Sequence, residues 1–186
     1  MGGDAHGWID AEDSVLLIVD LQEKFAPHIS RMKRIVQRTE ILLRAARLLE
    51  IPILATEQYP KGLGPTVAPI AELLGDTAPI EKTAFGCFGE PNFTAAFDAL
   101  GRKTLVLAGI ETHVCVLQTA LEGLERGLRV IAVQDAISSR KPADRKAGMR
   151  RMTLAGCTPV STEMILFEWM RDAKHPQFKA VQGLIQ

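Results

Sequence analysis

The stretch Ser14-Val15-Leu16-Leu17-Ile18-Val19-Asp20 decides the fold class of this 186-residue chain. Its unbroken apolar run ends in a carboxylate, which is typical of a strand buried on both faces of a parallel sheet. A second run of the same kind, from Thr104 to Gly109, lies much further along the chain. Because such strands need helices on both faces of their sheet, the two runs predict an α/β fold.

Short apolar runs alternate with segments of helical periodicity along the rest of the chain. The predicted strands are Ser14 to Asp20, Pro52 to Thr56, Pro79 to Lys82, Thr104 to Gly109, Leu128 to Val133 and Thr158 to Ser161. Predicted helices cover about 35–49, 68–74, 92–100 with Asn92 as its cap, Thr112 to Gly127, 143–154 and 162–171.

This alternation predicts right-handed crossovers and a three-layer α/β/α sandwich around a doubly wound, mainly parallel six-stranded sheet, with strand order 3-2-1-4-5-6. At this length we expect one domain over residues 1–186, with its core between about 14 and 170.

The predicted strand order brings distant residues together. The first and fourth strands are neighbours where the winding reverses, and ligands bind there at the carboxyl ends of the strands. Asp20 should therefore lie near the loop from Gly109 to Cys115. The third strand ends in Glu81-Lys82, and only one of these two side chains can face the same crevice because neighbours on a strand point to opposite faces.

These residues suit nucleophilic catalysis. Asp20 is a candidate base, and Cys115 lies in the first turn of the predicted Thr112 helix, where the helix dipole favours a thiolate. A lysine at position 82 would stabilise that thiolate, so the three side chains suit acyl transfer through a thioester. Each residue also has a structural interpretation, since most free cysteines are simply buried, a strand-end Asp can cap a turn, and a strand-end Lys can reach solvent.

The remaining cysteines and histidines give weaker signals. We interpret Cys87 and Cys157 as packing residues. His113 is two residues before Cys115, a spacing that does not place two helical side chains face to face. The histidines lack metal-ligand spacing, and the chain has neither a GxGxxG nor a GxxxxGK[ST] motif, so we expect no metal and no cofactor.

Composition limits the classes of binding partner and the cellular location that we expect. Lys and Arg number 22, Asp and Glu number 22, and the net charge is zero, so we expect no nucleic-acid partner and no anionic membrane surface. The apolar runs are far shorter than the ~20 residues that span a bilayer. Met1 to Gly7 carries an acid where a secretory leader carries base, so we expect a cytoplasmic protein.

Three separated motifs resemble the isochorismatase-like cysteine hydrolases, and the likeness extends from about Ser14 to Trp169. The motifs are Val19-Asp20-Leu21-Gln22-Glu23-Lys24-Phe25, Lys82-Thr83-Ala84-Phe85 and Gly109-Ile110-Glu111-Thr112-His113-Val114-Cys115-Val116. The resemblance implies that Asp20, Lys82 and Cys115 form a catalytic triad and that the Ile110–Glu111 peptide bond is cis. It also implies an oxyanion hole built from the N–H groups of Glu111 and Cys115, and a homo-oligomer.

Within that family, the chain is most similar to a subgroup of small uncharacterised hydrolases. Nicotinamidases carry an Asp and His metal site after the second strand, whereas this chain has Thr56-Glu57-Gln58-Tyr59 there and no His. No added basic cluster is present to select the two carboxylates of isochorismate.

The resulting hypothesis is a hydrolase that cleaves a small amide-like substrate. Alternatives are a ligand-binding or scaffold protein that keeps the triad as a relic, and an isochorismatase-type enol-ether hydrolase. A thiol redox role is weaker because the chain has no CxxC spacing. Candidates to line a pocket for a small-molecule substrate are Gln22, Phe25, Tyr59 and Phe85, although the aromatic residues could equally be ordinary packing.

Overall fold

Six strands form one sheet in the order β3-β2-β1-β4-β5-β6, and each neighbouring pair is parallel, as predicted. The structure is a computed structural model, and it describes residues 7–186. The strands are β1 Ser14–Val19, β2 Ile53–Gln58, β3 Ile80–Lys82, β4 Thr104–Ile110, β5 Arg129–Ser138 and β6 Thr158–Val160.

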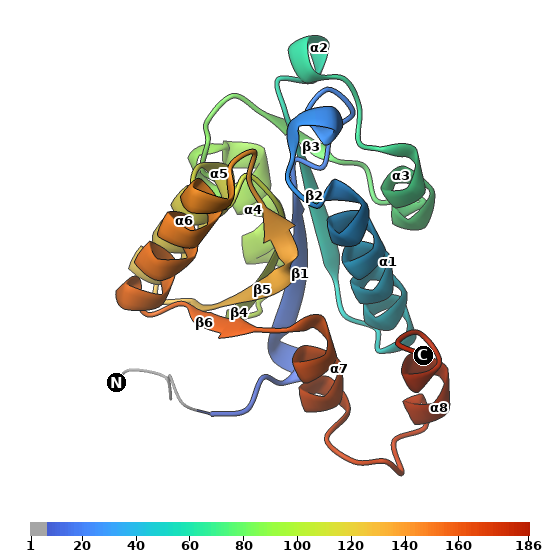
Figure 1. Ribbon diagram of the computed structural model, residues 1–186. Helices are drawn as coiled ribbons and strands as arrows, with labels where there is room; N and C mark the ends of the chain where they lie inside the picture. Colours follow the sequence, from blue (N-terminus) through green and yellow to red (C-terminus); the bar gives the residue numbers. More distant parts are fainter. Residues whose placement is uncertain (1–6) are drawn as a thin grey trace.

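Helices cover both faces of this sheet and complete the three-layer sandwich (Figure 1). They are α1 Met32–Leu48, α2 Pro60–Leu63, α3 Ala68–Leu74, α4 Pro91–Ala99, α5 Cys115–Glu125, α6 Pro142–Ala155, α7 Thr162–Met170 and α8 Phe178–Gln182. Alternate residues of β1 belong to two separate core clusters: Leu16 and Ile18 pack with α1 and α7, while Leu17 and Val19 pack with α4, α5 and α6. The sheet therefore has an apolar layer on each face, which explains the unbroken hydrophobicity of its central strands.

A close approach between β1 and β4 fixes the register at the centre of the sheet. Val19 is paired with Gly109, and a Cβ on Gly109 would lie 2.1 Å from the Val19 carbonyl oxygen. Gly109 also has a φ of 115°, a conformation that favours glycine. Glycine thus lets the carboxyl ends of β1 and β4 lie together.

Some element boundaries differ from the prediction. The helix expected at Thr112 begins at Cys115, because the backbone of Val114, with φ −124° and ψ −92°, is not helical. The cap of α4 is Glu90, whose carboxylate accepts from the Asn92 N–H, rather than Asn92 itself.

Other elements are longer than expected or were missed. β5 continues to Ser138, five residues beyond the predicted Val133, and still pairs with the end of β4 after a register shift. α8 lies after the last predicted helix. Ile9 and Val181 are both buried in the main core, so packing extends beyond the expected range of 14–170 on both sides.

Two expectations from the sequence concern membrane-spanning segments and an export signal. Within residues 7–186, no helix is long and apolar enough to cross a membrane. The segment on which the expectation of no export signal rests lies mostly at residues 1–6, outside the described residues.

Candidate active site

Asp20 stands at the carboxyl end of β1, in the centre of the sheet. Its carboxylate is 1% exposed and accepts hydrogen bonds from Thr56 Oγ1 at 2.8 Å and from Lys82 Nζ at 2.8 Å. Its φ of 49° turns the chain sharply out of the strand, a conformation that Asp tolerates better than most residues. The strand end and these two donors hold the carboxylate in one orientation.

Lys82 ends β3 and reaches across β2 to Asp20. Its Nζ donates to Asp20 Oδ2 at 2.8 Å and to Gln58 Oε1 at 2.7 Å, and it lies 3.2 Å and 3.0 Å from the carbonyl oxygens of Ala84 and Phe85. Glu81 is exposed, so the strand alternation directs Lys82 inward. Burial is the largest influence on Lys82 and lowers its pKa, but Asp20 together with Cys87 and Cys115 outweighs burial, so the pKa is raised and the ammonium stays charged.

Cys115 is the first residue of α5 and is 6% exposed. Burial raises the pKa of its thiol, the nearby Asp20 charge raises it further, and Lys82 opposes both. The result is a pKa above the usual range, whereas the helix dipole alone led us to expect a stabilised thiolate. The dipole acts on a buried sulfur beside a carboxylate, so the resting thiol keeps its proton and has that carboxylate next to it.

Two backbone N–H groups beside Cys115 are available to bind an anion. The Ile110–Glu111 peptide bond is cis. Among the described residues, the N–H groups of Glu111 and Cys115 donate to no backbone or side-chain acceptor, while their neighbours Val114 and Val116 both donate to the Glu111 carbonyl. The Glu111 carboxylate points elsewhere and accepts from the backbone N–H and Nε of Arg140 at 2.9 Å and 3.1 Å.

Two supporting residues on β2 were missed by sequence reasoning. Thr56 donates to Asp20, and the Gln58 side chain accepts from Lys82 and donates to the Thr83 carbonyl at 2.8 Å. The two residues are spaced i and i+2, so both face the same side of the strand that separates β1 from β3. Strand order and alternation together could have found them.

Cys87 also lies beside Asp20, Lys82 and Cys115. Its buried Sγ is 3.8 Å from Thr56 Oγ1, and its N–H donates to Thr119 Oγ1 at 3.0 Å. Burial raises the pKa of Cys87 to about 12, although Lys82 opposes the shift. Cys87 is thus a packed, neutral thiol, as expected, at a position that sequence reasoning did not connect with the site.

The pocket candidates occupy different environments. Gln22 is fully buried, and its amide braces the backbone of Gln58 and Gly64, with Nε2 donating at 3.0 Å and 2.8 Å. Phe25 packs against the main core. Tyr59 and Phe85 are 55% and 54% exposed, and both adjoin Lys82: the Tyr59 N–H donates to its carbonyl at 3.0 Å, and the Phe85 carbonyl lies against its ammonium.

A family model described as "Isochorismatase domain" matches residues 14–164. The chain belongs to the isochorismatase family. The matched range holds Asp20, Lys82 and Cys115, and the sheet with order 3-2-1-4-5-6 is the isochorismatase-like α/β fold.

Relatives place the chain within that isochorismatase family. "Isochorismatase domain-containing protein 2A" of Mus musculus is 42% identical over 181 residues, which are 97% of this chain and 86% of the relative. A structure described as MAR1 ribonuclease from Caenorhabditis elegans is 42% identical with a TM-score of 0.91, covering 96% of this chain and 92% of that one. YcaC from Pseudomonas aeruginosa, with hexane-2,5-diol and covalent acrylamide, is 28% identical with a TM-score of 0.89 and covers the same shares. These neighbours confirm the expected uncharacterised subgroup.

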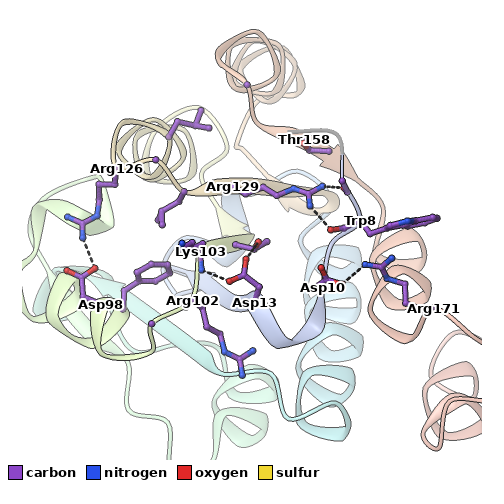
Figure 2. Close-up of a pocket in the computed structure, with 18 residues that line it drawn as sticks. Trp8, Asp10, Asp13, Asp98, Arg102, Lys103, Arg126, Arg129, Thr158 and Arg171 are labelled. Carbon is purple, nitrogen blue, oxygen red and sulfur yellow. Dashed lines mark hydrogen bonds and ion pairs between the residues drawn. The ribbon is translucent and has the colours of Figure 1, made fainter. Parts of the chain in front are cut away.

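A large cavity lies at the other edge of this isochorismatase fold, where the strands begin (Figure 2). It measures about 1410 Å³, and its wall includes Arg126 paired with Asp98 at 2.6 Å and Arg129 donating to the carbonyl of Trp8. Arg126 lies at the carboxyl end of α5, where the helix dipole favours a cation. The cavity wall contains no cysteine, and Asp20, Lys82 and Cys115 lie at the opposite, carboxyl edge of the sheet.

The described part of the chain shows no metal centre. Within residues 7–186, no group of three or more His, Cys, Asp or Glu side chains is arranged to hold a metal ion. His113 directs Nδ1 to Ser139 Oγ at 3.0 Å.

Proposed function

We propose that this member of the isochorismatase family is a cysteine hydrolase that cleaves the C–N bond of a small amide-like substrate. Asp20, Lys82 and Cys115 would form its triad. The observation that carries the proposal is the buried ion pair of Lys82 with Asp20 at 2.8 Å. Both charges of this pair act on the Cys115 thiol. A buried nucleophile beside an oriented base is the arrangement that covalent acyl transfer requires.

The reaction would begin with proton transfer. Asp20 takes the proton of the Cys115 thiol as the sulfur attacks the substrate carbonyl carbon. The N–H groups of Glu111 and Cys115 bind the resulting oxyanion. The proton then passes from Asp20 to the substrate nitrogen, the C–N bond breaks, and an amine or ammonia leaves a thioester on Cys115.

Water completes the cycle. Asp20 accepts a proton from the attacking water, the thioester carbon gains its oxygen, and the sulfur leaves and recovers the proton from Asp20. Lys82 keeps its charge throughout and holds the carboxylate in place through its bond to Oδ2. This division of roles fits a thiol whose pKa is raised, because such a thiol needs a base at the moment of attack.

Substrate size follows from the burial of the triad. Asp20 and Lys82 are 1% and 2% exposed and Cys115 is 6% exposed, so only a small group can reach the sulfur. The exposed rings of Tyr59 and Phe85 stand on the loops that follow β2 and β3, where they could cover a planar acyl group. The covalent acrylamide held by the Pseudomonas aeruginosa YcaC supports a reactive group on this fold that accepts a small amide.

A substrate panel tests the proposal. Wild type, Cys115→Ala and Cys157→Ala would be incubated with small amides, imides and enol ethers, and with an RNA oligonucleotide because one relative is described as a ribonuclease. We expect amide turnover by wild type and Cys157→Ala and none by Cys115→Ala. Turnover that survives in Cys115→Ala, or cleavage of RNA alone, would contradict the proposal.

A non-catalytic binding role remains the main alternative, and the same variants address it. Trapping the reaction by acid and mass spectrometry should reveal an acyl adduct on the Cys115 peptide. Tight binding of a metabolite, with no adduct and no turnover of any substrate by wild type, would favour the binding role.

A further inference from the structure

The outer side of α5 and α6 carries an apolar groove that no described part of the chain fills. Its volume is about 700 Å³, and its apolar floor includes Leu121, Ala147 and Leu154. Leu154 is 78% exposed, the largest exposed fraction among the large apolar side chains. Exposed apolar side chains gathered between two helices make this groove a candidate site of interaction.

Basic side chains surround the groove. Lys146, Arg150 and Arg151 are exposed and line it, and no acidic residue does. None of the three forms an ion pair within residues 7–186. The groove therefore fits an occupant that brings both apolar side chains and carboxylates.

The chain itself carries a surface of that chemistry on α7. Glu163, Met164 and Phe167 are all exposed, and their i, i+1 and i+4 spacing puts them on one side of the helix. Met164 and Phe167 are 50% and 39% exposed, and Glu163 has no ion-pair partner in the described chain. We call these three residues the α7 patch.

We propose that the α7 patch of one copy docks into the α5–α6 groove of a second copy. The apolar side chains would fill the floor, and Glu163 would meet the cations of the rim. α7 packs on the opposite face of the sheet from α5 and α6, so the patch and the groove of one molecule point apart (Figure 1). The contact is therefore made between copies.

The arrangement is head-to-tail rather than two-fold. A contact between two different surfaces leaves a free patch and a free groove at the ends of a pair, so it propagates to a ring or a filament. A two-fold contact of groove against groove would instead place Arg150 and Arg151 beside their own copies, which like-charge repulsion disfavours. The proposal concerns assembly and is independent of the catalytic role of Cys115.

Charge reversal with mixing tests the contact. Sedimentation velocity would be run on wild type, on Glu163→Lys, on the double variant Arg150→Glu/Arg151→Glu, and on an equimolar mixture of the two variants. We expect wild type to assemble and each variant alone to dissociate at concentrations at least about tenfold higher than wild type does. The mixture should reassemble, because every contact in an alternating assembly again joins opposite charges.

Controls separate the interface from general charge effects. Glu72→Lys on α3 and Lys33→Glu on α1 change exposed charges away from both surfaces and should assemble like wild type. A monomeric wild type, a single variant that assembles as wild type does, or a mixture that stays dissociated would overturn the proposal. A monomeric wild type would instead favour an acidic segment of another protein as the occupant of the groove.

A second measurement needs no variant. A zero-length carbodiimide reagent joins a carboxylate to a lysine amine only when the two are in contact. In an assembled sample we expect a Glu163–Lys146 cross-link between isotopically distinct copies, detected by mass spectrometry. An assembled sample without that cross-link would overturn the proposed contact.

Discussion

Lys82 Nζ lies 2.8 Å from Asp20 Oδ2, and both side chains are closed to solvent, at 0% and 1% exposure. The two residues are 62 positions apart and come from β3 and β1, with β2 between them. From the intervening β2, Thr56 donates to Asp20 and Gln58 accepts from Lys82, so that strand holds both members of the pair. The ion pair therefore links three strands, and its two charges act on the neighbouring Cys115 thiol.

Breaking the pair should cost stability as well as reactivity. We expect Asp20→Asn and Lys82→Met each to lower the free energy of unfolding by about 3–5 kcal/mol, because each leaves a buried group without its partner. The double variant Asp20→Asn/Lys82→Met should recover much of that loss without recovering reactivity. Urea unfolding measures the first effect, and additive losses in the double variant would argue against a coupled pair.

The pKa of Cys157 predicts a stability that depends on pH. Burial raises it from 9.0 to about 12 in the folded state. Below about pH 9 both states keep the proton; above it the unfolded chain releases the proton first, so stability falls as pH rises toward 12. The free energy of unfolding should lose up to about 1.4 kcal/mol per pH unit for this thiol.

Variants isolate that contribution. Cys157→Ala should show a smaller slope between about pH 9 and about pH 10.5, measured by urea unfolding. Val160→Ala, at a buried apolar neighbour in sequence, should lose stability at every pH and keep the wild-type slope. Equal slopes in wild type and Cys157→Ala would refute the assignment.

Gly148 permits a close approach between α6 and the segment before Cys115. A Cβ at this position would lie 2.9 Å from both the Thr112 carbonyl oxygen and the His113 Cα. We expect Gly148→Ala to shift that segment, to cost about 1–3 kcal/mol of stability despite the better helix propensity of Ala, and to slow Cys115 labelling. Thr153→Ala, at an exposed position of the same helix, should leave the stability and the rate of Cys115 labelling unchanged.

Sequence reasoning reached the strand order and the convergence of Asp20, Lys82 and Cys115 because each depends on patterns that a single chain carries. Apolar runs marked β1 and β4, and the doubly wound rule placed their ends together. It missed Glu90 as the cap of α4, which depends on the hydrogen bond from the Asn92 N–H, and Cys115 as the first residue of α5, which depends on the non-helical backbone of Val114.

The raised pKa of Cys115 could not be predicted from the sequence for a similar reason. Its position at a helix start is readable from the sequence, but its burial and its contact with Asp20 depend on packing from three strands and a helix. Position along a helix and solvent exposure have opposite effects on a thiol, so only the folded arrangement decides the direction.

The most direct test of the account is the labelling rate of Cys115 by acrylamide, followed peptide by peptide with mass spectrometry, in wild type and in Asp20→Asn. In the variant, position 20 has no carboxylate to take the thiol proton, and the buried Lys82, left without its counter-ion, is driven toward the neutral form and no longer supports a thiolate. We predict that wild type is labelled at Cys115 before Cys87 or Cys157, and that Asp20→Asn is labelled at least about 100-fold more slowly near neutral pH. Equal rates in the two proteins, or first labelling at another cysteine, would contradict the account.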